Sequence, residues 1–184
     1  YGLTAYDWRL RQPFFTFIMC VLMIPAQVSV IGFYQFIYKL RWTNSFWPLI
    51  LPSIAAPASV FFMRQYLIAT LSIDIVNSAR IDGAGEFFTF NRIILPIMTP
   101  ALATQAIFAF VASWNNYFVP TILLSDSDKY TMPIMVSLLR GDIYKTEYGS
   151  VYLGLAATTL PLFIVYFLLS KYIIAGVALG GVKE

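Results

Sequence analysis

The residues best suited to chemistry lie in one polar stretch, Asn77 to Pro96, which reads NSARIDGAGEFFTFNRIILP. It carries four charged residues and two glycines: Arg80, Asp82, Glu86, Arg92, Gly83 and Gly85. Charged side chains form ion pairs and hydrogen bonds, and the glycines interrupt any continuous spanning helix. Because long apolar segments flank the stretch, we expect it to lie in water on one side of a membrane. Its chemistry would then be the recognition of another protein.

Catalytic chemistry finds no support in the residues. The chain has no histidine, and its one cysteine, Cys20, lies inside an apolar run. This excludes histidine-based metal sites, cysteine–histidine nucleophiles and disulfides within the chain. The nearest approach to an ATP-binding loop, GVALGGVK from Gly176 to Lys183, lacks the Gly-Lys-Ser/Thr ending and follows an apolar helix instead of a strand. We expect this chain to be no enzyme and to hold no metal or cofactor.

The composition predicts a membrane protein. Hydrophobic residues make up 59% of 184, and charged residues 11%, whereas soluble domains carry roughly 25% charged residues. Charge-free runs cover residues 12–38, 42–63, 93–125 and 148–170, and each reaches the ~20 residues needed to cross the hydrocarbon core. Continuous apolar runs favour helices over alternating barrel strands. We predict an all-α polytopic membrane bundle with spanning helices near 14–38, 46–68, 97–122 and 151–173.

Lysine and arginine placement predicts the orientation. Four crossings put both ends of the chain and the 64–96 segment on one side, with seven basic residues: Arg9, Arg11, Arg64, Arg80, Arg92, Lys171 and Lys183. The other side has five: Lys39, Arg41, Lys129, Arg140 and Lys145. The positive-inside rule makes the polar stretch and the C-terminus cytoplasmic, in a bacterial inner or plasma membrane. The net charge of +3 then needs no nucleic acid partner.

The chain has no internal repeat and no low-complexity linker, so we predict one transmembrane domain over residues 1–184. Residues 1–12 resemble the end of a preceding helix and a cytoplasmic loop, and we expect the N-terminal part of the protein to be missing. Residues 73–96 would form the cytoplasmic loop. Residues 125–147 would be extracytoplasmic and partly helical through 133–140.

The cytoplasmic loop is predicted as two short helices joined by an elbow. Residues 73–81 have helix-compatible composition, and Asp82-Gly83 is a turn signal. A second helix would begin near Glu86 and place four apolar residues on one stripe: Phe87, Phe90, Ile93 and Ile94. Three small residues would give the elbow a surface that another protein can approach closely: Ala79, Gly83 and Ala84. A plain amphipathic loop resting on the lipid headgroups explains the same residues, and both interpretations stay open.

The elbow carries a recognisable pattern, A-x-x-D-G-A followed by F-x-x-I-x-L-P, ending at Leu95 and Pro96. This resembles the EAA signature of inner-membrane permease subunits of binding-protein-dependent ABC importers. The signature's opening Glu-Ala is absent, since Asn77 and Ser78 stand there. Asp74 stands where a further upstream acidic residue is common.

The resemblance extends along nearly the whole chain, in MIPAQVSVIGFYQFIYKLRWTNSFWPLILP, FFMRQYL, FVASWNNYFVP, LLSDSDKYTMPI and GVALGGVKE. These segments are similar to carbohydrate-uptake permeases related to the second permease subunit of the maltose system. The resemblance implies half of a sugar channel, paired with a homologous permease, two cytoplasmic ATPase subunits that use the ATP, and an extracytoplasmic sugar-binding protein. It implies a coupling helix that docks on the ATPase through Asn77, Ser78, Ala79, Arg80, Asp82, Gly83 and Ala84.

The translocation path is predicted from polar residues of the third spanning helix: Gln105, Ser113, Trp114, Asn115 and Asn116. Asparagine amides suit sugar hydroxyls, and Trp114 or Tyr117 suits stacking on a sugar ring. The same groups suit contacts with the partner permease. Two other functions stay open, an importer for another small polar solute and a passive channel or scaffold subunit.

Overall fold

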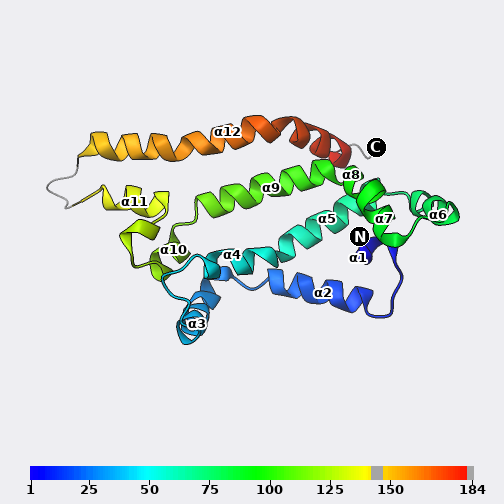
Figure 1. Cartoon of the computed structure of the whole chain (residues 1–184), viewed down its shortest axis with the longest axis horizontal. Helices are drawn as coiled ribbons and strands as arrows, with labels where there is room; N and C mark the ends of the chain where they lie inside the picture. The colour runs from blue at the N-terminus through cyan, green and yellow to red at the C-terminus, as the bar shows by residue number, and fades with distance from the viewer. Residues whose placement is uncertain (142–146, 182–184) are drawn as a thin grey trace. The chain divides into compact units, whose positions relative to one another are not determined.

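The computed structural model describes residues 1–141 and 147–181, with side chains described up to Ser170. Every regular element in these ranges is helical, so the all-α prediction is confirmed. In chain order the elements are α1 (Gly2–Ala5), α2 (Arg11–Leu22), α3 (Ala26–Lys39), α4 (Trp47–Ile54), α5 (Pro57–Thr70), α6 (Ile73–Ile81), α7 (Glu86–Thr89), the π-helical turn η1 (Phe90–Ile94), α8 (Leu95–Ile97), α9 (Thr99–Trp114), α10 (Phe118–Leu123), the 3-10 turn η2 (Ser127–Lys129), α11 (Met132–Leu138) and α12 (Tyr148–Gly181). Figure 1 labels them along the chain.

Two helical stretches are long and apolar enough to cross a membrane, Trp47–Thr70 and Tyr148–Ser170. Two further stretches are long and apolar enough only if two consecutive helices are counted as one span: α2 with α3, and Glu86–Ile97 with α9. Each of these pairs is bent at a short break between its two helices. The described residues therefore allow up to four spans by length and composition. Since the bend separates the polar residues before Ile97 from α9, we take α9 as the spanning part of the second pair.

The predicted spans are less continuous than the sequence suggested. The 14–38 span is sharply bent before Ala26, where Pro25 precedes α3. The 46–68 span has only a short break before Pro57, the first residue of α5, and still passes as one span, Trp47–Thr70. Proline lacks the N–H that would continue a helix, and its ring restricts the preceding residue. The 97–122 span is interrupted between Trp114 and Phe118, and this break contains two of the predicted path residues, Asn115 and Asn116.

The chain divides into two compact units, each assembled from segments distant in sequence. Unit 1 comprises residues 1–24, 57–107 and 169–184, and unit 2 comprises residues 25–56 and 108–168. Both α9 and α12 run from one unit into the other. A single domain stays a prediction.

The core of unit 1 lies where the predicted cytoplasmic loop meets the end of α5. Leu67 of α5, Val76 of α6, Ile94 of η1 and Met98 are buried together. Five half-buried side chains surround them: Tyr1, Met63, Leu71, Phe90 and Ile93. The loop of residues 73–97 is therefore a packed extension of α5, which gives its polar residues fixed positions.

Unit 1 is also tied together where α2 lies against α5. The guanidinium of Arg64 lies 4.0 Å from the centre of the Phe15 ring, and its Nε donates to the carbonyl of Leu3 at 3.3 Å. The Phe15 ring also stacks near Phe61, with the ring centres 6.3 Å apart. A cation over an aromatic ring is attracted by the ring's quadrupole. These contacts hold the N-terminal residues and α2 against α5.

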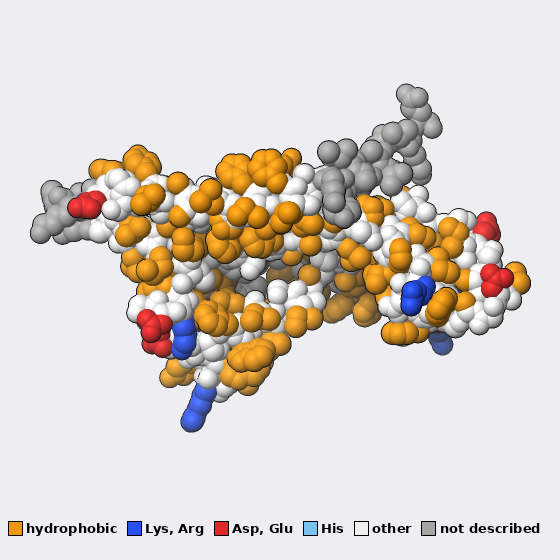
Figure 2. Space-filling model, turned by 45° about the horizontal axis from the view of Figure 1, so that its top comes forward, with side chains coloured by type: hydrophobic (Ala, Val, Ile, Leu, Met, Phe, Trp, Pro, Cys, Tyr) orange, Lys and Arg blue, Asp and Glu red, His pale blue; other side chains and the backbone are white. Residues whose placement is uncertain are grey.

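The surface is mostly apolar. Hydrophobic side chains cover much of the face in Figure 2, and charged side chains gather in a few small groups. Large apolar residues such as Met23, Val28 and Leu153 are strongly exposed. Soluble monomers rarely expose this much contiguous apolar surface, so lipid or partner subunits must cover it.

Candidate functional site

The helix α6 is short, with nine residues, but its first residue is fixed by a cap. Ser72 precedes it in an extended conformation, and its side-chain oxygen accepts the N–H of Asp74 at 3.3 Å. This is the geometry of a helix N-cap. Asp74 lies in the first turn and Arg80 in the last, where each charge is favoured by the helix dipole.

The end of α6 is closed by a Schellman motif. The N–H of Ala84 donates to the carbonyl of Ala79 at 2.9 Å, and the N–H of Gly83 donates to the carbonyl of Arg80 at 3.0 Å. Gly83 has a φ of +79°, in the left-handed region that side chains disfavour. A Cβ added to Gly83 would have no atom within 4 Å, so the backbone conformation alone requires glycine here. The predicted Asp82-Gly83 elbow is confirmed.

The predicted small-residue surface of the elbow is wrong in part. Ala79 is 5% exposed, because it follows Val76 by three residues on the face of α6 that packs into the core. Gly83 is exposed, and Ala84 is half-buried. The remaining predicted coupling residues are exposed at the elbow: Asn77, Ser78, Arg80 and Asp82.

Large apolar side chains flank the elbow in place of small ones. Ile81 is 86% exposed and Phe87 is 83% exposed, with Phe88 also exposed. We call these three residues the elbow patch. The sequence placed Phe87 on one stripe with Ile94, yet Ile94 is fully buried. The π-turn explains the difference, because its wider turn shifts the register between the two residues.

A charged cluster joins the elbow to the start of the chain. Arg80 Nε pairs with Glu86 Oε1 at 2.7 Å, and Arg80 also lies over the Tyr6 ring, 5.4 Å from its centre. The Tyr6 hydroxyl donates to Glu86 Oε2, and the Tyr1 hydroxyl donates to the same oxygen at 3.4 Å. Figure 1 shows α1 beside the turn between α6 and α7. Sequence reasoning missed this cluster, because the tyrosines are about 80 residues away and no pattern links them to Glu86.

The cluster keeps the Glu86 carboxylate ionised. The hydrogen bond from Arg80, and then that from Tyr6, lowers the pKa of Glu86. Partial burial and the hydrogen bond to Glu86 raise the pKa of the Tyr6 hydroxyl. Because the pKa of Glu86 is lower in the folded state than in the unfolded state, its ionised carboxylate stabilises the folded state at pH values above the unfolded-state pKa. This stabilisation is lost as the pH falls through the folded-state pKa. At neutral pH the cluster is therefore intact.

The structure does not bring the predicted path residues together. Gln105 lies in unit 1, where its Oε1 accepts the Ser59 hydroxyl at 2.9 Å and joins α9 to α5. Trp114 lies in unit 2, where its indole N–H donates to the carbonyl of Thr158 in α12 at 2.9 Å. These polar groups therefore join helices within the chain. Ser113 and Trp114 line a hollow of about 270 Å³ beside Pro133.

Asn115 and Asn116 lie in the break between α9 and α10, outside the continuous helix that the sequence predicted. The Asn115 amide donates to the carbonyl of Val111 at 3.0 Å, and Asn116 Oδ1 accepts the N–H of Val119 at 3.4 Å. Asn115 also lines a hollow of about 390 Å³ with Tyr117 and other residues: Pro133, Val136, Ser137, Arg140, Leu155 and Thr158.

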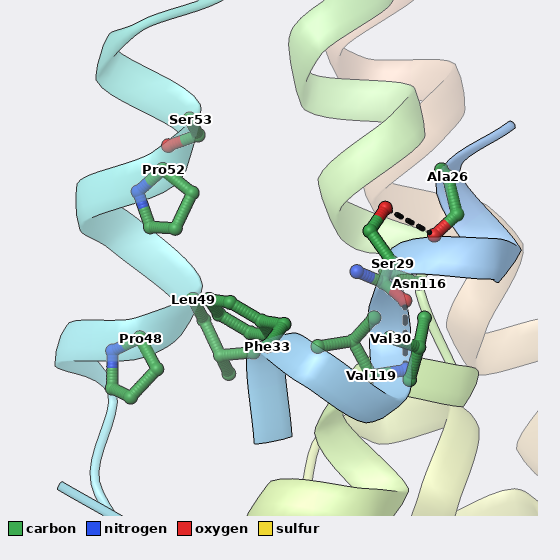
Figure 3. Close-up of a pocket in the computed structure, with 10 residues that line it drawn as sticks. All are labelled: Ala26, Ser29, Val30, Phe33, Pro48, Leu49, Pro52, Ser53, Asn116 and Val119. Atoms are coloured by element: carbon green, nitrogen blue, oxygen red, sulfur yellow. Dashed lines mark hydrogen bonds between the residues drawn. The ribbon is translucent and has the colours of Figure 1, made fainter. Parts of the chain in front are cut away.

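Asn116 lines a different hollow of about 420 Å³ between α3, α4 and the start of α10. Phe33 from α3 and Leu49 from α4 extend into the space between the two helices (Figure 3). The hydroxyls of Ser29 and Ser53 donate to carbonyls of their own helices, Ala26 and Ile50. Little polar capacity is left in these walls, so the hollow is largely apolar.

Two loops of unit 2 are joined through Asn44. Its N–H donates to the carbonyl of Leu123 at 2.7 Å, and its side-chain oxygen accepts the N–H groups of Ser125 and Asp126 at 3.1 Å each. Its amide donates to the Asp126 carboxylate at 2.6 Å, and Lys129 Nζ donates to the Asn44 carbonyl at 2.9 Å. The hydrogen bond from Asn44, followed by that from Lys129, lowers the pKa of Asp126.

We expect Asn44→Gly and Asn44→Ala both to loosen the loop of residues 123–130. Each variant removes the acceptor for two backbone N–H groups, at about 1 kcal/mol each. Alanine should cost more than glycine, since Asn44 has a φ of +56° and alanine disfavours that conformation. Limited proteolysis and thermal unfolding in detergent measure the effect. Wild-type protease resistance in both variants would contradict it.

Comparison with known proteins identifies the family. Residues 2–178 match the family described as "Binding-protein-dependent transport system inner membrane component". An arabinooligosaccharides transport system permease protein of Halalkalibacterium halodurans is 38% identical over 183 residues, which cover 100% of this chain and 65% of the relative. A trehalose/maltose transport system permease protein of Thermococcus litoralis is 31% identical over 186 residues, covering 100% of this chain and 66% of the relative.

The fold has a counterpart among solved structures. The crystal structure of a bacterial ABC transporter involved in the import of the acidic polysaccharide alginate contains a chain that superposes with a TM-score of 0.80. That chain is 22% identical, and the match covers 94% of this chain and 65% of the other. The chain described here thus spans slightly less than two thirds of the length of these proteins. It belongs to the family of binding-protein-dependent transport system inner membrane components, and it is a multi-pass membrane protein.

Proposed function

We propose that this chain is a permease subunit of an ATP-driven importer for sugars or oligosaccharides. The family and the relatives named for arabinooligosaccharide and trehalose/maltose transport support this substrate class. The chain would form half of the translocation path beside a homologous second permease. An extracytoplasmic binding protein would deliver the sugar, and two cytoplasmic ATPase subunits would bind and hydrolyse the ATP. The chain itself would carry no cofactor, perform no catalysis and bind no nucleic acid.

The observation that carries the proposal is the elbow between α6 and α7. It is exposed, yet its backbone is fixed by an N-cap at Ser72 and by the Schellman motif at Gly83. The elbow patch gives it apolar contact area of the kind that protein interfaces bury. Such a surface suits docking into a cleft of the ATPase, with both the elbow and the C-terminus in the cytoplasm.

The coupling residues would act in two ways. Exposed residues would contact the ATPase directly: Asn77, Ser78, Arg80, Asp82 and Gly83. Ala79 and Ala84 would act from beneath, by fixing α6 on the core through Ala79 and by closing the Schellman motif through Ala84. Closure of the ATPase dimer would then move α6 as a rigid element. That motion would reach α5 through the shared core of Leu67 and Val76.

For the translocation path, the hollow beside Asn115 suits a sugar best among the candidates. It combines the ring of Tyr117 with Asn115 and Ser137, each of which donates to a backbone carbonyl and keeps a side-chain oxygen that can accept from a sugar hydroxyl. Sugars are bound by hydrogen bonds together with aromatic stacking. Gln105 and Trp114 already donate or accept within the chain. We therefore assign them a supporting role, which fixes α9 beside the path.

Transport in reconstituted vesicles tests the proposal. The complex would be purified from its native membrane with its partner subunits, and uptake of labelled arabino-oligosaccharides would be measured with and without ATP and binding protein. We expect uptake that requires both. Flux without ATP would indicate a passive channel and would contradict the proposal.

A second substrate class has a specific observation in its favour. An sn-glycerol-3-phosphate transport system permease protein of Yersinia enterocolitica is 29% identical over 177 residues, covering 96% of this chain and 63% of the relative. Small polar solutes other than sugars thus occur among the relatives. Competition of glycerol 3-phosphate with the labelled oligosaccharide separates the two classes.

A further inference from the structure

The Glu86 carboxylate is the point at which three parts of unit 1 meet. It belongs to α7, it pairs with Arg80 of α6, and it accepts hydroxyls from Tyr1 and Tyr6 in the segment before α2. The Tyr1 and Tyr6 rings also contact each other edge-on, with centres 5.2 Å apart. One carboxylate therefore connects both sides of the elbow to a segment about 80 residues away.

Several contacts position the N-terminal segment within unit 1. Residues 1–3 are held by the bond from Arg64 to Leu3 and by Tyr1, which packs against the core with its ring centre 5.6 Å from that of Phe90. Tyr6, which is nearer to α2, contacts the elbow through Glu86 and Arg80. The bonds to Glu86 thus set where Tyr6 and the start of α2 lie relative to the elbow.

The cluster fixes the relative positions of segments in unit 1 and contributes little to the free energy of unfolding. The side chains of Arg80 and Glu86 are 38% and 48% exposed, and water screens exposed ion pairs strongly. Of the four cluster residues, only Tyr1 packs against the core around Leu67, Val76 and Ile94. Loss of the carboxylate should therefore leave the core folded.

We propose that Glu86 is a positioning residue that links the elbow directly to the segment leading into α2. A displacement of the elbow then reaches α2 through Tyr6, in addition to α5 through the core. This inference rests on the proposed coupling function. The elbow is joined along the chain to α6 and α7, whereas α2 follows the N-terminal segment. The bonds of Glu86 therefore connect the elbow to a helix that the chain itself does not join to it.

Two variants and one control test the link in the complex purified from its native membrane. Glu86→Gln loses the ion pair with Arg80 and leaves one accepting oxygen, which cannot serve both Arg80 and the tyrosine hydroxyls as the two carboxylate oxygens do. Tyr6→Phe removes one hydroxyl and keeps the ring beneath Arg80. Asp7→Asn is the matched control, since it breaks the neighbouring Asp7–Arg11 pair without contacting Glu86.

Amide hydrogen exchange reports the link without ATP or solute. The N–H groups of Thr4 and Ala5 donate to the Tyr1 carbonyl at 2.8 and 3.0 Å, and their protection depends on α1 staying docked. We expect their exchange to rise about tenfold in both variants, as in locally fraying segments, and to stay unchanged in Asp7→Asn. Peptides covering residues 63–71 should exchange as in the wild type.

The coupling readout is the number of arabino-oligosaccharides imported per ATP hydrolysed. We expect this ratio to fall at least about fivefold in Glu86→Gln, the low end of usual coupling between sites, whereas a merely structural loss lowers uptake and hydrolysis together. Unchanged exchange at Thr4 and Ala5 in both variants would overturn the link even if the wild type imports sugar. Faster exchange with an unchanged ratio would overturn its role in coupling. A wild type that imports nothing would overturn the proposed function, while the exchange result would still decide whether the link exists.

Discussion

Gly83→Val should lower ATP-driven uptake at least about tenfold while the membrane helices stay folded. Gly83 has a φ of +79°, and side-chain-bearing residues pay roughly 1–2 kcal/mol in this region, with β-branched residues paying most. The strain is relieved only by opening the Schellman motif, which releases the N–H groups of Gly83 and Ala84. The elbow would then lose the geometry with which it docks.

Gly85→Ala is the matched control for this result. Gly85 is two residues away, has an ordinary φ of −67°, and a Cβ there would also have no atom within 4 Å. Alanine should therefore be accepted at position 85 with near-normal uptake. Vesicle uptake, sugar-stimulated ATP hydrolysis and circular dichroism of the purified complex separate docking from folding. Normal sugar-stimulated hydrolysis in Gly83→Val would sink the assignment of the elbow as the coupling element.

Ile81→Glu combined with Phe87→Glu should release the ATPase subunits from the complex. Both side chains are more than four-fifths exposed, so the changes cost the isolated chain little. If the ATPase covers them, each lost apolar contact removes about 1.5–3 kcal/mol, and each buried carboxylate adds a further penalty. Affinity should therefore fall at least about 100-fold.

Co-purification with a tagged ATPase measures this loss. The conservative pair Ile81→Val with Phe87→Leu keeps an apolar elbow patch and should retain the ATPase. Retention of the ATPase by the double glutamate variant, with transport intact, would show that the elbow patch faces lipid headgroups. That outcome would restore the alternative of an amphipathic loop resting on the membrane.

Local patterns predicted the helical class and the elbow, but not the breaks inside the predicted spans. Apolar runs of more than 20 residues indicate membrane helices whatever their surroundings, and Asp82-Gly83 indicates a turn because glycine tolerates positive φ. The exposed face of α7 could not be predicted in the same way. A π-turn has no reliable sequence signal, so a regular helix was assumed and Phe87 was placed with Ile94.

Contacts between segments distant in the chain could not be predicted from the sequence, for a different reason. The bonds of Glu86 with Tyr6 and of Asn44 with Asp126 join residues about 80 positions apart. A single sequence carries no information on which of many tyrosines or carboxylates will meet. The break at Asn115 is also invisible to composition, because the run from 93 to 125 is uniformly free of charge.

The π-turn at Phe90–Ile94 also sets a direction. Each residue of an α-helix advances about 100° around the axis. Because the π-turn holds an extra residue, the side chains before it are rotated around the axis relative to the side chains after it. The direction in which Phe87 and Phe88 point around the helix axis is therefore decided in Phe90–Ile94, outside the elbow itself. Two permeases with identical elbow sequences would aim them differently if only one had this turn.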